Sequence, residues 1–138
     1  MAPRSSKTIA CSVEDARARL RVALAYLEVS DLILDEKQHT EFLTVATGLA
    51  VLAGIAASDC ICGIRLGQIH RGQSHQGAAD LLATAVPDGA KLASTLRRLL
   101  DLKDASHYGV KFISGRSASD AVRWARTLVE RAEHEAQR

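Results

Sequence analysis

Aromatic residues make up only 4% of the 138-residue chain, and proline occurs only at Pro3 and Pro87. This scarcity argues against an extensive sheet, because strands prefer aromatic and β-branched residues. Alanine and leucine are instead abundant, and both favour helices. The composition therefore predicts a mainly helical protein, and the length fits one domain that is large enough to bury a core.

Cysteine is also scarce, with three residues and no Cys-x-x-Cys spacing. Cys60 and Cys62 point to different sides of a helix, and Cys11 leaves the count odd. Neither a disulfide nor a zinc site is predicted from this arrangement. We expect three small buried side chains in a reducing cytoplasm, and no metal or cofactor.

Charge of one sign is not in large excess, since the net charge is +2. That value is too small to indicate nucleic-acid binding by itself. The distribution is uneven, however: residues 91–138 carry ten Lys or Arg against six Asp or Glu, and residues 1–90 carry eight against ten. The C-terminal third is therefore mildly basic.

Long hydrophobic runs are missing as well. The longest run, Val45–Ala57, has thirteen residues, whereas a membrane span needs about twenty. No apolar segment follows the polar residues 1–7, so no signal peptide is predicted. We expect a cytoplasmic protein with a buried core helix over this run and no membrane contact.

Apolar residues recur at helical spacing through most of the chain. We expect residues 1–11 to be a flexible polar tail and residues 12–138 to form a single domain. Helices are predicted over about residues 12–34, 40–69 and 74–86, from the Pro87-Asp88-Gly89 turn to about His107, and over 117–135. Together they predict an all-α, up-and-down bundle of four to five helices.

Helix starts are marked by polar residues of the capping type. Ser12 with Asp15, and Ser117 with Asp120, have the spacing of a capping box. Gly72 fits the residue that follows a helix, and Ser74 fits the cap of the next one. Residues 109–115 are predicted to be a loop or one short strand-like segment.

The first predicted helix carries two apolar stripes. One contains Val13, Ala16, Leu20, Leu24, Leu27 and Leu34, and the other contains Val22, Tyr26, Val29 and Ile33. A surface helix normally buries one stripe only. We therefore expect this helix to be covered on two sides, by its own core and by a second protomer.

Several charged residues are candidates for chemistry. Asp59 lies deep in an apolar helix. It serves there either as an acid or metal ligand or, more commonly, as the partner of a basic group or the cap of a neighbouring helix. Arg65 and His70 have the spacing Arg-x4-His, which arises readily by chance. His75 follows the Arg71 turn, where it either orients the turn or faces an active cleft.

Lys103 and His107 are the most informative pair. They are four residues apart, so they share one face of a helix. An ammonium and an imidazole presented together can hold a phosphate and move a proton, which is the chemistry of RNA cleavage. The same pair also occurs on inert helix ends, where the helix dipole favours cations.

The segment Lys103-Asp104-Ala105-Ser106-His107-Tyr108 resembles the signature region of HEPN domains. The resemblance extends to the apolar helix ending Ala56-Ala57-Ser58-Asp59, to Arg71-Gly72 with Ser74-His75-Gln76-Gly77-Ala78, and to the last helix with its Ser-x-x-Asp start. It covers residues 13–135. Two departures matter: Lys103 stands where the family has Arg, and only three residues separate it from His107. Lysine cannot grip two phosphate oxygens as the arginine fork does.

The resemblance implies a dimeric helical bundle that acts on RNA without a metal. His107 would then move protons, Lys103 would stabilise the phosphorane, and Arg65, Arg71, His75 and Tyr108 would contact phosphate or RNA. Tyr108 either stacks on a base or packs against the last helix. The implied setting is a bacterial toxin–antitoxin or defence system.

Two other functions remain open at this point. A non-catalytic HEPN-like module would bind a nucleotidyltransferase, an antitoxin or another partner protein, or a nucleotide, and the Lys103 departure favours it. A plain helical scaffold would use the two-sided first helix for oligomerisation. We expect a homodimer in each case.

Overall fold

The computed structural model describes residues 7–36, 40–107 and 113–138. Its helices and strands are, in chain order, β1 (Thr8–Ala10), α1 (Val13–Glu36), α2 (Thr40–Leu66), β2 (Gln68–His70), α3 (Gln76–Ala85), α4 (Gly89–Asp101), α5 (Lys103–His107) and α6 (Gly115–Ala136).

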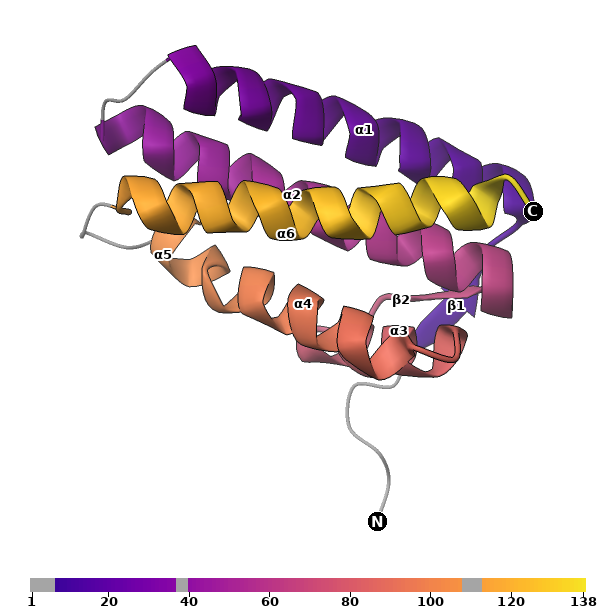
Figure 1. The fold of residues 1–138 in the computed structure, drawn as a ribbon. Coiled ribbons are helices and arrows are strands. Elements are labelled where there is room, and N and C mark those ends of the chain that lie inside the picture. The colour runs from indigo at the N-terminus through magenta and orange to yellow at the C-terminus, as the bar shows by residue number, and fades with distance from the viewer. Residues whose placement is uncertain (1–6, 37–39, 108–112) are drawn as a thin grey trace.

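Helix α2 is the centre of the bundle, and it contacts α1, α6 and the α3–α5 segment. Helices α1, α2 and α6 run alongside one another, and the hairpin of α3 and α4 lies below them (Figure 1). The strands add only one small antiparallel ladder. The prediction of an all-α helical bundle is confirmed.

The core is built mainly from small and aliphatic side chains. Every residue of α2 from Ala56 to Gly63 is buried. The three cysteines are buried and free, as predicted. Burial raises the pKa of Cys60 to about 11 and that of Cys62 to about 12, so these thiols stay protonated at neutral pH.

Helix α2 is long and apolar enough to cross a membrane when length and composition alone are considered. However, 72% of its most apolar window is buried inside the protein. Such burial is typical of a core helix, which is the role predicted for Val45–Ala57.

The predicted start of α1 is confirmed. The backbone N–H of Asp15 donates to Ser12 Oγ over 3.0 Å, and the backbone N–H of Ser12 donates to Asp15 Oδ2 over 3.3 Å. The predicted cap at Ser117 is wrong by three residues. Ser114 caps α6 instead, because its extended backbone lets its hydroxyl accept from the Ser117 N–H over 3.0 Å.

Part of the predicted tail is ordered. Strand β1 pairs with β2 in the register Thr8 to His70 and Ala10 to Gln68. Two further backbone hydrogen bonds, from Cys11 N–H to Gly67 O and from Arg71 N–H to Lys7 O, extend this pairing, each over 2.9 Å. A three-residue strand has too little pattern to be found by periodicity.

Two predicted helix ends also differ from the structure. Helix α2 stops at Leu66 rather than near residue 69, because Gly67 has a φ of +69°, a conformation that favours glycine. The predicted fourth helix is divided at Leu102 into α4 and α5. Of the predicted loop or strand-like segment 109–115, residues 113–115 lie within the described part of the chain. Ile113 packs with Leu43 and Ala118, and Gly115 already begins α6.

Gly89 is the first residue of α4, directly after the turn from α3, and it has no room for a side chain. A Cβ there would collide with the backbone carbonyl groups of Leu82 and Ala83. We expect Gly89→Ala to lower the free energy of unfolding by about 1–3 kcal/mol, because backbone must move to relieve the overlap.

The matched control for this prediction is Gly115→Ala, since a Cβ on Gly115 meets nothing within 4 Å. It should leave stability unchanged or raise it by up to about 1 kcal/mol, because alanine restricts the unfolded chain. Urea denaturation of the three proteins checks both values, and equal stability of the two variants would contradict the packing at Gly89.

Candidate functional site

The predicted site residues Arg71 and His75 lie in the turn that joins β2 to α3. This turn is anchored to the core by Asp59, whose buried carboxylate accepts from Arg19 Nε over 3.1 Å and from Arg71 Nη1 over 3.4 Å. Arg71 Nη1 also donates to the carbonyl of His70 over 2.8 Å. The expectation that Asp59 pairs with basic groups is confirmed.

The carboxylate of Asp59 joins three segments that are far apart in the chain. Burial raises its pKa above the usual value, and the positive charges of Arg19 and Arg71 partly offset that increase. The Arg71 side chain stays 43% exposed. It can therefore present positive charge to a ligand from a position that the buried carboxylate fixes.

His70 holds the turn closed from inside. Its ring nitrogen Nε2 lies 2.7 Å from the carbonyl oxygen of Ser74, to which it donates as the N–H tautomer. The ring lies against Gly77, where a Cβ would overlap it. His70 is therefore a structural residue of the turn.

His75 occupies the cap position of α3 but makes no side-chain capping hydrogen bond. Ser74, the predicted cap, instead accepts from the Gln76 N–H over 3.3 Å. The pKa of His75 is lowered by burial and by the positive charges of Lys103 and His70, while Asp59 opposes the shift. A neutral imidazole at neutral pH follows, and it can accept a proton.

Lys103 begins α5 and comes within electrostatic range of His75. The antiparallel hairpin of α3 and α4 separates the two residues in the chain, and α5 then packs against α2. His107 is the last residue of α5, but its imidazole lies outside what the structure describes, and Tyr108 lies outside the described residues altogether.

Arg65 belongs to a different network, on the side of α2 that faces α6. Its Nη1 donates to Glu135 Oε1 over 3.1 Å, and Arg131 Nε donates to Glu135 Oε2 over 2.8 Å. Glu135 is 1% exposed. The structure therefore places Arg71 and His75 in one turn, with Lys103 in electrostatic range of His75. It places Arg65 in an ion pair elsewhere.

The Glu135 network continues to the turn between α3 and α4. Arg131 donates from both terminal nitrogens to the carboxylate of Asp88, over 2.7 and 2.8 Å. Sequence reasoning missed this network and the partner role of Arg19. A signal was present for Glu135, since it continues the packing positions Leu128 and Ala132 at helical spacing.

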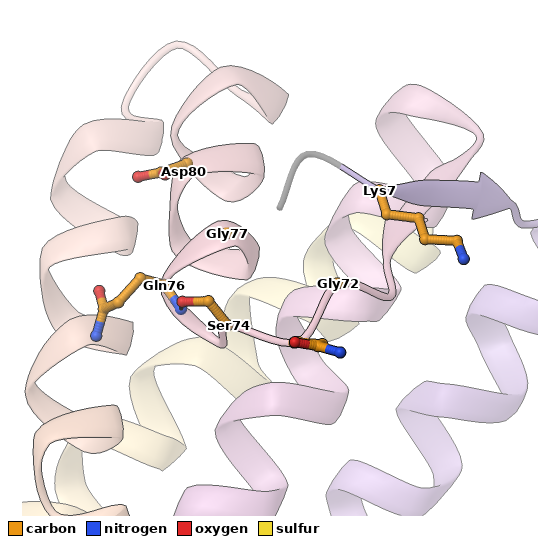
Figure 2. Close-up of a pocket in the computed structure, with 7 residues that line it drawn as sticks. Lys7, Gly72, Ser74, Gln76, Gly77 and Asp80 are labelled. Atoms are coloured by element: carbon orange, nitrogen blue, oxygen red, sulfur yellow. Dashed lines mark hydrogen bonds between the residues drawn. The ribbon is translucent and has the colours of Figure 1, made fainter. Parts of the chain in front are cut away.

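A cavity of about 740 Å³ lies on the outer side of the turn. Figure 2 shows Lys7 beside β1 on one side of it, with Gly72 and the start of α3 at Ser74 and Gln76 on the other. Asp80 also lines it and pairs with Arg97 over 2.7 Å. None of the predicted site residues lines this cavity.

No protein-family model matches the sequence, and a search of the curated proteins finds no match. Within the part of the chain that the structure describes, no group of three or more His, Cys, Asp or Glu side chains is arranged to hold a metal ion.

Proposed function

We propose that this is a HEPN-like, RNA-acting protein whose phosphate site is formed by Arg71, His75 and Lys103, completed by His107. The observation that carries the proposal is the electrostatic effect of Lys103 on His75. His75 precedes α3 and Lys103 begins α5, yet the ammonium, after burial, helps to lower the pKa of the imidazole. A neutral base beside a cation suits a phosphodiester substrate.

The chemistry that this group of residues supports is transesterification of RNA. The ribose 2′-oxygen attacks the adjacent phosphorus, the new O2′–P bond forms, and the P–O5′ bond breaks. His75 accepts the proton of the 2′-hydroxyl, and protonated His107 donates one to the leaving 5′-oxygen. Lys103 and Arg71 stabilise the negative charge of the phosphorane. The products are a 2′,3′-cyclic phosphate and a 5′-hydroxyl.

The family resemblance supports a bacterial toxin–antitoxin or defence system as the setting. In such a system the cytoplasmic protein acts on RNA, and its partner is an antitoxin or a nucleotidyltransferase. A gene for either partner beside the gene for this chain would support this setting. The mildly basic C-terminal third of the sequence is compatible with an RNA partner.

A second candidate function is favoured by a specific observation. The guanidinium of Arg71 is already engaged by Asp59 and the carbonyl of His70, and lysine replaces arginine at position 103. A site of this kind holds a phosphate without cleaving it. The protein would then be a non-catalytic module that binds a partner such as a nucleotidyltransferase.

Lys103→Ala tests the phosphate site directly. We expect the variant to bind a short single-stranded RNA more weakly, by about tenfold, and to lose one unit of the slope of log affinity against log salt, since one phosphate contact is removed. Lys91→Ala, which removes an exposed lysine at the other end of α4, should change neither value. Fluorescence anisotropy at several salt concentrations measures both.

Incubation of the wild-type protein with the same RNA separates the two functions. Cleavage that persists in EDTA and leaves a cyclic phosphate would support the metal-independent enzyme. Binding that Lys103→Ala weakens, without cleavage, would support the second candidate. Equal RNA affinity of the wild type and Lys103→Ala would overturn the phosphate site.

A further inference from the structure

The outer face of α1 is apolar where a surface helix is normally polar. It carries Ala18, Val22, Ala25, Val29 and Leu32, which we call the outer stripe. These positions alternate in steps of four and three, the spacing of a coiled-coil seam. Val22, Val29 and Leu32 are 37%, 45% and 56% exposed.

The structure corrects the stripe predicted from the sequence. Val22 and Val29 were assigned to it and are exposed, whereas Tyr26 and Ile33 are half-buried, and Tyr26 packs against the core. Ala25 and Leu32 complete the exposed set in their place. The core side of α1, at Ala16, Ala23 and Leu27, is buried on the opposite face.

A groove of about 560 Å³ runs beside the outer stripe, between α1 and α6. Its apolar residues are Leu24, Ala25 and Leu27, and its charged residues include Arg21 and Glu28. Side chains of a helix packed on the outer stripe have room in this groove. The outer stripe therefore forms a ridge of apolar side chains beside a groove, the arrangement by which helices pack against one another.

The charges beside the stripe identify the occupant. Arg21 and Glu28 are exposed, two helical turns apart and on the same edge of α1. When two copies of α1 pack antiparallel about a two-fold axis near Leu24 and Ala25, each Arg21 meets Glu28 of the other copy. A self-complementary pattern of this kind suits an isologous interface.

An anionic membrane surface is a poorer match for this edge. Membrane-binding helices carry lysine and arginine along the polar border. Here the C-terminal half of the border carries the carboxylates of Glu28 and Asp31, and the nearby Arg126 is paired with Asp31 over 3.1 Å. We therefore propose that the outer stripe is the docking surface for a second copy of this chain, with the two α1 helices antiparallel. The surface is separate from Arg71, His75 and Lys103.

Light scattering and sedimentation of the purified protein test the pairing. The wild type should have twice the 14.8 kDa mass of the chain. Arg21→Glu should raise the dimer dissociation constant by about tenfold or more, because the symmetry creates two like-charge pairs, and Glu28→Arg should do the same. The double variant Arg21→Glu/Glu28→Arg should recover dimerisation, since the complementary pairs are restored.

Val29→Lys tests the contribution of the outer stripe to dimerisation. Leu66→Lys is the control, because Leu66 is as exposed as Val22 but lies at the end of α2, away from the outer stripe. The first should give a monomer and the second a dimer. Circular dichroism shows whether each variant is folded. A monomeric wild type, or a dimer that the Arg21, Glu28 and Val29 changes leave intact, would overturn the proposal.

Cross-linking distinguishes the antiparallel arrangement from a parallel one. Near the two-fold axis, Ala25→Cys should join two copies through a short bismaleimide, whereas Leu32→Cys should not join to itself. It should instead join to an Ala18→Cys copy. Self-linking of Leu32→Cys at the same rate as Ala25→Cys would indicate parallel helices and exclude the proposed geometry.

Discussion

His75→Ala is expected to lower the rate of RNA cleavage by about 10²- to 10⁴-fold, the usual contribution of a general base. The imidazole is half-buried and makes no capping hydrogen bond, so its removal leaves the fold of the turn intact. RNA affinity should change little, because Arg71 and Lys103 keep their charges. Cleavage of a short RNA under single-turnover conditions measures the rate.

The pH dependence of cleavage adds a sharper test of the same residue. The imidazole acts as a base only when neutral, so on the acidic side the rate should rise with pH. The midpoint of that rise should lie below 6.5, the value of an ordinary histidine, since burial and nearby cations lower the pKa of His75. Because Lys103 contributes to that lowering, Lys103→Ala should move the midpoint of the rise to higher pH.

His134→Ala is the matched control for these measurements, since His134 is exposed near the end of α6. It should cleave at the wild-type rate. An active wild type whose rate is unchanged by His75→Ala, or whose midpoint does not respond to Lys103→Ala, would remove His75 from the mechanism. Loss of activity in His107→Ala alone would then leave His107 as the proton carrier.

Glu135→Gln is expected to cause a large loss of stability, about 2–3 kcal/mol. Removing one member of a buried ion pair typically costs about 3–5 kcal/mol, because the other charge is left buried without a partner. The side chains of Arg65 and Arg131 are about a quarter exposed, so water can solvate their charges in the variant and reduce this cost. The carboxylate also lies at the C-terminal end of α6, where the helix dipole disfavours it unless cations are close. Urea denaturation at pH 7 measures the loss.

The loss of stability caused by Glu135→Gln should become smaller as the pH falls. Burial opposes ionisation of Glu135, but hydrogen bonds from Arg131 and Arg65 outweigh it, so the pKa is lowered from 4.5. The stabilisation is therefore present above the unfolded value and disappears as pH falls through the lower folded value. The difference in the free energy of unfolding between the wild type and Glu135→Gln should therefore decrease from pH 7 to about pH 3.

Asp59→Asn should show the opposite trend, because burial raises the pKa of Asp59. Its contribution to stability is present below the unfolded pKa and is lost as pH rises through the folded pKa. The difference in the free energy of unfolding between the wild type and Asp59→Asn should therefore decrease as the pH rises. Parallel trends in the two variants would contradict the opposite environments assigned to these carboxylates.

Much of the fold was predictable because its causes are local. The spacing of Leu92, Leu96 and Leu99 indicates a helix from the chain alone, and the Ser12–Asp15 box marks a helix start within four residues. The turn at residues 87–89 is equally local. Strand β1 was missed since its pairing with β2 depends on residues about sixty positions away.

The same distinction between local and long-range causes applies to the candidate site. The sequence alone determined the residue types, a cation and an imidazole on neighbouring turns, and the apolar character of both sides of α1. Only the tertiary structure decided that Lys103 acts electrostatically on His75. It likewise decided that Asp59 pairs with Arg19 and Arg71, and that Arg65 pairs with Glu135. Periodicity records the face of a helix on which a residue lies, whereas ion pairs join distant segments whose meeting depends on how the helices pack.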